Sequence, residues 1–171
     1  VRNVLHGLAA AALSTQKTPE RPDPGDVVAG QYVVEKLLGE GGMARVYLAR
    51  DNKLGTSVAL KLLNSACAGD PTVVERFLTE ASIQAKLVHP EAHPNIVAVY
   101  RILRESPVGF VMEYVPGTTL EDFLRDHVAT EAQLVDVFAQ ICAGLEHAHQ
   151  QRVIHRDLKL SNILLLGTPG S

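Results

Sequence analysis

The run HRDLKLSN, at residues 155–162, gathers charged and amide side chains into one short stretch of the chain. An aspartate such as Asp157 can accept a proton from an attacking hydroxyl, and a lysine such as Lys159 can neutralise a phosphoryl group during its transfer. The amide oxygen of Asn162 can hold a divalent cation. A polar loop after a helix would look similar in isolation, so the interpretation depends on the segments that precede this one.

The sequence VALK, at residues 58–61, places a lysine inside an otherwise apolar strand. Taken alone, Lys61 would simply lie on the exposed face of that strand. Glu80, however, lies beside Phe77 and Leu78 on a predicted helix, on the side that faces the sheet, where an isolated carboxylate is costly to bury. An ion pair between Lys61 and Glu80 would satisfy both groups, and we predict it.

The sequence LGEGGMARV, at residues 38–46, lies between two predicted strands. Glycines at such a turn let the backbone approach phosphate oxygens and offer its N–H groups to them, although a plain hairpin turn would explain them equally well. A dinucleotide-binding GxGxxG motif needs a helix after it, and here a strand follows, which argues against a Rossmann domain. Gly25 and Gly30 have P-loop spacing but lead into Gln31 rather than lysine.

The chain between these motifs predicts a small sheet. Alternating apolar residues predict a three-stranded antiparallel meander over residues 31–38, 44–50 and 57–63, with turns at GEGG and DNKLG. Two further strands are predicted at 95–103 and 109–115.

Helices are predicted before and after the last two strands. Asp70 followed by Pro71 is typical of a helix N-terminus, and that helix should continue to Leu87. A capping box at residues 118–121 predicts a short helix, and a longer helix is predicted over 131–151, followed by one more strand at 163–165. The apolar residues expected to pack the first helix on the sheet are Val74, Phe77, Leu78, Ala81 and Ala85.

Composition restricts the possible partners and location. The chain has 16 Lys and Arg against 19 Asp and Glu, a net charge of −3, so we expect no nucleic-acid partner. An apolar run of about 18 residues, as a membrane span needs, is not found, so we expect no membrane partner for these residues. Cys67 and Cys142 form no CxxC pair, and we interpret them as reduced core thiols of a cytoplasmic protein. Residues 1–27, rich in proline and charge near their end, are predicted to be a flexible leader.

Taken together, the three motifs resemble those of a eukaryotic-type serine/threonine protein kinase, and GEGGMARVYLARD is similar to the bacterial members in particular. The resemblance implies an α+β, protein-kinase-like fold. A five-stranded antiparallel sheet with one flanking helix would form the N-lobe, with the hinge, over residues 28–115. The first part of a mainly helical C-lobe would follow over residues 116–171.

The resemblance also implies ATP and Mg²⁺ as cofactors and a Ser or Thr of a protein as the phosphate acceptor. Asp157 and Lys159 would belong to the catalytic loop, with the lysine two positions after the aspartate as in serine/threonine-specific enzymes, and Asn162 would bind the metal. Lys61 would hold the α- and β-phosphates and would itself be positioned by Glu80. The residues expected around the nucleotide are Leu38, Gly39, Glu40, Gly41, Gly42, Val46, Ala59, Lys61, Met112, Glu113, Val115 and Leu164.

This sequence departs from the family pattern at a few places. Ala44 replaces the third glycine of the hairpin, and Leu160 stands where proline is usual. The DFG motif, whose aspartate binds the principal magnesium, is expected soon after Leu165 and does not occur in these 171 residues. The resemblance therefore covers a little more than half of a kinase domain. We expect the 171-residue chain alone to be truncated before DFG and catalytically incomplete, with the apolar face of the helix at 131–151 partly uncovered.

Two other functions fit the same residues. A non-catalytic, pseudokinase-like module would bind a nucleotide or a partner without phosphoryl transfer, and a stop codon directly after Ser171 would favour it over the enzyme. A small-molecule phosphotransferase is disfavoured by Lys159 and by the glycine-rich hairpin. No oligomeric state follows from the sequence.

Overall fold

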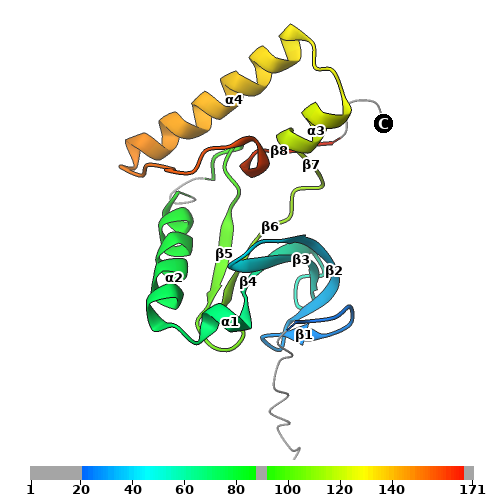
Figure 1. The fold of residues 1–171 in the computed structure, drawn as a ribbon, viewed down its shortest axis with the longest axis vertical. Helices are drawn as coiled ribbons and strands as arrows, with labels where there is room; N and C mark the ends of the chain where they lie inside the picture. The colour runs from blue at the N-terminus through cyan, green and yellow to red at the C-terminus, as the bar shows by residue number, and fades with distance from the viewer. Residues whose placement is uncertain (1–20, 88–91, 168–171) are drawn as a thin grey trace, which may run out of the picture.

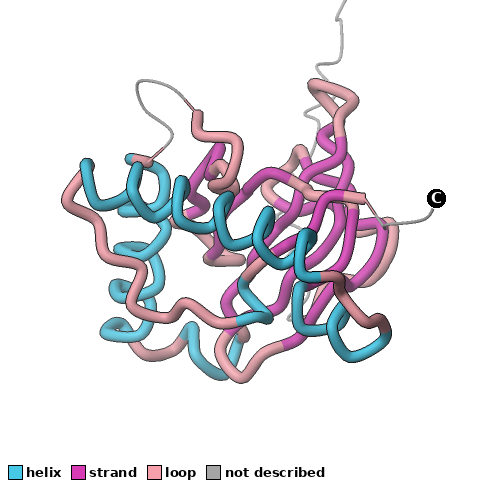
Figure 2. The backbone as a smooth tube through the Cα atoms, turned by 90° about the horizontal axis from the view of Figure 1, so that it is seen from above, coloured by secondary structure: helices cyan, strands magenta, loops and turns pink. Residues whose placement is uncertain are grey.

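The computed structural model describes residues 21–87 and 92–167, which form a curved antiparallel sheet, a helix packed on it and a mainly helical part beyond (Figure 1). The α+β architecture predicted from the sequence is confirmed. The main sheet has six strands in the order β1-β2-β3-β4-β6-β5, one more than expected. Figure 2 shows the twist of these strands from above, with helices gathered beside them. The predicted division of the chain at residue 115 stays a prediction.

The first strands of the sheet form the predicted meander, because their apolar residues alternate between the two faces. The strands of the main sheet are β1 (Val27–Val28), β2 (Tyr32–Glu40), β3 (Ala44–Asp51), β4 (Ser57–Leu63), β5 (Val99–Leu103) and β6 (Gly109–Glu113). Strand β5 begins four residues later than predicted. The segment before it turns instead, since the N–H of Ile96 donates to the carbonyl of His93 at 3.1 Å.

Strand β1 is the unexpected sixth strand. Val27 pairs with Val33 and Val28 pairs with Tyr32, and Val28 is fully buried. The leader predicted for residues 1–27 is therefore too long at its C-terminal end, because residues 21–27 belong to the folded part. The strand was missed because two residues after a proline- and glycine-rich run give no alternating pattern. Residues 1–20 lie outside the described part.

Helix α2 (Pro71–Lys86) covers one face of the sheet, as predicted. Asp70 caps it, with a side-chain oxygen that accepts a hydrogen bond from the N–H of Thr72 at 2.8 Å. A short helix, α1 (Ser65–Ala68), precedes it and was not predicted. Apolar side chains from α2 and the facing strands form one core cluster: Leu63, Phe77, Leu78, Ala81, Val99 and Phe110. The opposite face of the sheet holds the second cluster: Val28, Tyr32, Val34, Tyr47, Ala49, Val58, Leu60, Leu62, Leu103 and Val111.

The chain then crosses to a small two-stranded sheet and a short helix. Strand β7 (Gly117–Thr119) pairs with β8 (Leu164–Leu166), and helix α3 (Leu120–Asp126) follows β7 directly. The N-cap of α3 is Thr119 rather than Thr118, because β7 continues through Thr119, whose side-chain oxygen accepts a hydrogen bond from the N–H of Asp122 at 3.0 Å. The N-cap predicted at Thr118 is thus displaced by one residue, to Thr119, and β7 was missed.

Helix α4 (Glu131–Gln150) begins at the N-cap Thr130, which forms a capping box with Gln133. Its buried positions are Gly144 and Ala148. The expectation that its apolar face would be partly uncovered is confirmed, since Val135 is 63% exposed and Phe138 is 59% exposed.

The two cysteines are free, but Cys142 on α4 is exposed, so its interpretation as a core thiol is wrong. Cys67 is partly buried. Cys142 lies on α4, whose buried positions are Gly144 and Ala148, and it belongs to neither core cluster. None of the described helices combines the length and the apolar character that crossing a membrane requires.

Candidate active site

Lys61, on β4, meets Glu80 of α2, as predicted. Its Nζ lies 3.8 Å from Oε1 of Glu80. The expectation that Glu80 would be buried is wrong, because its side chain is 67% exposed while that of Lys61 is 31% exposed. Phe77, Leu78 and Ala81 occupy the buried positions of the helix, which leaves Glu80 at the rim. An ion pair this exposed contributes little to the free energy of folding. Its main effect is to orient the side chain of Lys61.

Two aromatic rings also hold the lysine. The Nζ atom of Lys61 lies 5.5 Å from the ring centroid of Phe110 and 5.9 Å from that of Phe77. The two rings pack against each other at 5.4 Å and are almost fully buried. A cation over an aromatic face is attracted by about 0.5–1 kcal/mol where water still reaches it. The ammonium of Lys61 therefore lies over two buried aromatic rings, and its side chain is still 31% exposed.

Several predicted nucleotide-binding residues lie on the same face of the sheet as Lys61. Gly39 is opposite Val46, and Val46 is opposite Lys61, so the three form a row across β2, β3 and β4. Two residues along β4, Ala59 lies opposite Met112 of β6. Side chains that face each other across neighbouring strands share one face of a sheet, as do residues two apart along a strand. The register thus brings these five residues together.

The glycine-rich hairpin closes with a bond from the N–H of Gly41 to the carbonyl of Ala44, at 2.9 Å. A Cβ added to Gly39 or Gly42 would meet no atom within 4 Å, and one added to Gly41 would meet only the Ala44 carbonyl, at 3.4 Å. None of the three has a positive φ. The fold itself therefore does not require glycine at Gly39 or Gly42, whereas the close approach of a phosphate to this backbone would.

Glu40, the remaining predicted residue of the hairpin, is held by arginines. Its carboxylate lies 2.7 Å from Nε of Arg45 and 3.6 Å from Nη2 of Arg21. The side chain is thus turned to two cations of this chain. Any nucleotide contact at this position would come from the backbone.

The connection after β6 carries the predicted adenine contacts. The N–H of Glu113 donates to the carbonyl of Ala98 at 2.8 Å, and the Glu113 carboxylate accepts from the N–H of Ala98 at 3.2 Å. Val115 follows in the irregular chain before β7 and is partly buried. Leu38 and Leu164, the predicted apolar cover, are 42% and 44% exposed. These two leucines offer apolar surface that a flat ring could cover.

The three polar residues of the loop at 155–162 lie together. Oδ2 of Asp157 receives hydrogen bonds from Nζ of Lys159, at 3.0 Å, and from Nδ2 of Asn162, at 3.2 Å. The same Nδ2 donates to the Asp157 carbonyl at 2.8 Å, across a short 3₁₀ turn, η1 (Leu160–Asn162). The hydrogen bonds from Lys159 and then Asn162 lower the pKa of Asp157 below its ordinary value. Asp157 is therefore held as a carboxylate.

Asn162 has a side-chain oxygen that could bind a divalent cation. Its amide nitrogen is used in both bonds to Asp157, which leaves Oδ1, an oxygen of the kind that Mg²⁺ prefers. Across residues 21–87 and 92–167, no group of three or more His, Cys, Asp and Glu could hold a metal ion.

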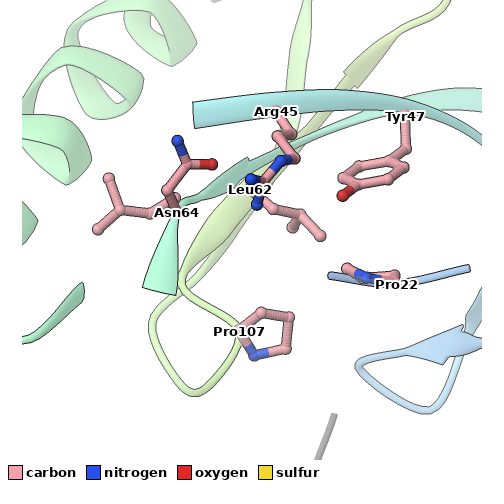
Figure 3. Close-up of a pocket in the computed structure, with 7 residues that line it drawn as sticks. Pro22, Arg45, Tyr47, Leu62, Asn64 and Pro107 are labelled. Atoms are coloured by element: carbon pink, nitrogen blue, oxygen red, sulfur yellow. The ribbon is translucent and has the colours of Figure 1, made fainter. Parts of the chain in front are cut away.

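Two hollows in the structure lie away from these residues. A groove of about 710 Å³ runs along α2, between Pro71 and Lys86, and reaches Arg104 and Val108. A hollow of about 10 Å³ lies behind β3 and β4 (Figure 3). The predicted nucleotide-binding residues line neither of them. The nucleotide pocket as a whole stays a prediction.

One contact of the hairpin was missed by the sequence analysis. Asn64, directly after β4, donates from Nδ2 to the carbonyls of Gly41 and Gly42, at 3.1 and 3.0 Å. The only signal in the sequence is an asparagine at the end of an apolar strand, which is usually part of a turn.

Comparison with known proteins agrees with this arrangement. Residues 32–170 match the model of the protein kinase domain. The chain is 44% identical over 147 residues to the serine/threonine-protein kinase PknJ of Mycobacterium tuberculosis, which covers 85% of this chain and 24% of that protein. It is 37% identical over 143 residues to the serine/threonine-protein kinase PrkC of Bacillus subtilis, covering 82% of this chain and 22% of that protein.

A solved structure has the same fold. The crystal structure of the Mycobacterium tuberculosis PknI kinase domain superposes with a TM-score of 0.71 at 28% identity, covering 85% of this chain and 58% of that chain. The chain spans 24% and 22% of the length of the two curated relatives. From the matched domain, the sequence identity and the shared fold, the chain belongs to the protein kinase family.

Proposed function

We propose that the protein transfers the γ-phosphoryl group of ATP to a serine or threonine hydroxyl of a protein substrate. The observation that carries the proposal is the loop cluster, in which the Asp157 carboxylate is bonded to Lys159 and Asn162. A carboxylate held ionised can accept the proton of the attacking hydroxyl, and an adjacent ammonium can offset the negative charge of the phosphoryl group. Because the chain spans 24% of the curated relative PknJ, the proposal concerns the complete protein.

The sheet would supply the nucleotide contacts. Lys61, oriented by Glu80 and by the rings of Phe77 and Phe110, would hold the α- and β-phosphates. The hairpin at residues 39–44 would cover the phosphates with backbone N–H groups. The open space beside Gly39 and Gly42 supports this placement.

The apolar residues would hold the adenine ring. Val46 and Ala59 would contact it from the sheet and Leu164 from β8, with Met112 beside it. The N–H and the carboxylate of Glu113 both bond to Ala98. The backbone carbonyl of Glu113 would therefore contact the edge of the adenine ring, and the backbone of Val115 would supply the second contact.

Asn162 would hold a magnesium ion through Oδ1. When bound, this ion would neutralise phosphate charge and fix the geometry of the leaving and attacking oxygens. A cytoplasmic location and a protein partner with a Ser or Thr acceptor are part of the proposal, and absence of nucleic-acid binding stays a prediction.

The test is transfer of label from γ-labelled ATP to a protein substrate, followed by identification of the labelled residue. We expect phosphoserine and phosphothreonine, and a loss of about 10²–10⁴-fold for Asp157→Ala, since that is the contribution typical of a general base. Asp126→Ala, an exposed aspartate on α3, is the matched control and should retain activity. Nucleotide binding without transfer by the complete protein would replace this proposal with the non-catalytic module.

A further inference from the structure

Asn64 holds three consecutive carbonyls at the tip of the glycine-rich hairpin. Its Nδ2 donates to the carbonyls of Gly41 and Gly42, at 3.1 and 3.0 Å, and its backbone N–H donates to the carbonyl of Met43, at 2.9 Å. Asn64 follows the last residue of β4, three positions after Lys61. The tip of the hairpin and the lysine are therefore attached to the same strand.

These bonds fix the direction of the peptide groups at the tip. In a trans peptide the carbonyl and the next N–H point in opposite directions. Because the carbonyls of Gly41 and Gly42 point to Asn64, the N–H groups of Gly42 and Met43 point away from it. Within residues 21–87 and 92–167, neither N–H has an acceptor. Successive free N–H groups of this kind are what binds an anion.

Asparagine is suited to this contact by its chemistry. The carboxamide nitrogen has two hydrogens, one for each carbonyl, whereas an aspartate would set an acceptor against two acceptors. Oδ1 of Asn64 is buried and has no hydrogen-bond partner among the described residues. A buried oxygen without a partner costs stability, so the folding of β4 alone does not explain asparagine at this position.

The small hollow behind the sheet does not explain why asparagine occupies position 64. Figure 3 shows the Asn64 carboxamide at one end of this hollow and the Tyr47 hydroxyl at the other, with Arg45 and Leu62 between them. The carboxamide bonds to the hairpin and not to any residue that lines the hollow.

We propose that Asn64 is a positioning residue of the nucleotide site, which turns the N–H groups of Gly42 and Met43 toward the phosphates of ATP. This inference rests on the proposed function, because it assumes that the hairpin covers a nucleotide. Asn64 would act through the backbone of the hairpin and need not touch the nucleotide. Its loss should therefore weaken phosphate binding and leave adenine binding unchanged.

The test compares the affinities of the complete protein for MgATP and for adenosine, by titration calorimetry. Asn64→Ala and Asn64→Asp should weaken MgATP binding about tenfold, as expected for two lost hydrogen bonds, with the larger effect for aspartate. Adenosine affinity should change by less than about twofold, and Asn64→Gln, which keeps the carboxamide, should recover part of the loss. Asn52→Ala, in the exposed turn after β3, is the matched control and should leave both affinities unchanged.

The contrary outcomes are distinguishable. If Asn64→Ala binds MgATP as the natural chain does while Lys61→Ala loses binding, the inference is wrong and the proposed function stands. Equal losses for ATP and adenosine would show a general structural role and overturn the inference as well. A complete protein that binds neither ligand would overturn the proposed function, and with it this inference. Asn64→Gln keeps the comparison valid if the alanine or aspartate variant fails to fold.

Discussion

Lys159 and Asp157 form a contact of 3.0 Å, between Nζ and Oδ2, and Asn162 donates to the same oxygen. Within residues 21–87 and 92–167, no donor lies on the second oxygen, Oδ1. The carboxylate thus has one oxygen fixed by the loop and one oxygen free to accept a proton. This division fits a general base, whose free oxygen must face the substrate hydroxyl.

The lowered pKa of Asp157 predicts a pH dependence. Lys159→Ala and Asn162→Ala should each raise the pKa of Asp157 toward the ordinary value of 3.8, with the larger change for Lys159. The reason is that each variant removes a donor that favours the carboxylate. NMR titration of the Asp157 carboxyl carbon measures the shift, and an unchanged pKa in both variants would contradict the contact.

The lowered pKa of Asp157 also determines how its contribution to stability changes with pH. Because the pKa is lowered on folding, the contribution of Asp157 is present above pH 3.8 and disappears as the pH falls through the lower folded value. Between pH 5 and 8 the two variants should therefore show no pH-dependent change of stability from Asp157. A stability difference that appears between pH 6 and 8 would point to another group.

Lys61→Ala should abolish binding of MgATP by the full chain and change the unfolding temperature little. The Lys61–Glu80 pair is partly exposed, so its loss costs the fold little, whereas the phosphates lose their nearest ammonium. Glu80→Gln should weaken binding less, because Phe77 and Phe110 still orient the lysine. Calorimetry against Lys53→Ala, in an exposed turn, measures the effect, and an unchanged affinity for Lys61→Ala would defeat the placement of the nucleotide.

Gly117→Ala should destabilise the pairing of β7 with β8. A Cβ at this position would clash with the backbone carbonyl of Leu165, so one strand must move. We expect a loss of about 1–3 kcal/mol in the free energy of unfolding, as for other overpacked sites. Gly69→Ala is the control, because no atom lies within 4 Å of its added Cβ. Urea unfolding compares the two, and equal stabilities would mean that β7 and β8 are not paired as described.

Phe110→Ala should reduce the free energy of unfolding by about 3–5 kcal/mol. Phe110 is 1% exposed and packs on Phe77 below Lys61, so the variant leaves a cavity in the core. Phe138→Ala, at a position 59% exposed on α4, should change stability by less than about 0.5 kcal/mol. Denaturant unfolding of both variants checks the assignment of core and surface, and a reversed order would contradict it.

The sequence predicted the parts of this fold that depend on local pattern. The meander, the N-cap at Asp70 and the Lys61–Glu80 pair follow from alternation, capping chemistry and the cost of an isolated charge. Strands β1 and β7 were missed, because a strand of two or three residues is defined by its partner and not by its own sequence.

The missed details of the site have a similar cause. Helix α3 begins one residue later than predicted because β7 continues through Thr119, which pairs with Leu164 of β8, a residue far away in the chain. Asn64 could not be identified because its partners are backbone carbonyls, whose direction no residue pattern specifies. Phe77, Leu78 and Ala81 fill the core as predicted, but the residue pattern of α2 does not show that Glu80, between them, lies at the rim of that face.

The central claim is that the ion pair on the sheet and the carboxylate–amide cluster of the loop at 155–162 serve one nucleotide. A crystal structure of the full chain with Mg²⁺ and a non-hydrolysable ATP analogue tests it most directly. We predict phosphate oxygens in contact with Nζ of Lys61, magnesium on Oδ1 of Asn162, and Asp157 facing the terminal phosphate. A nucleotide bound away from Lys61, or one that leaves the loop cluster without contact, would contradict the account.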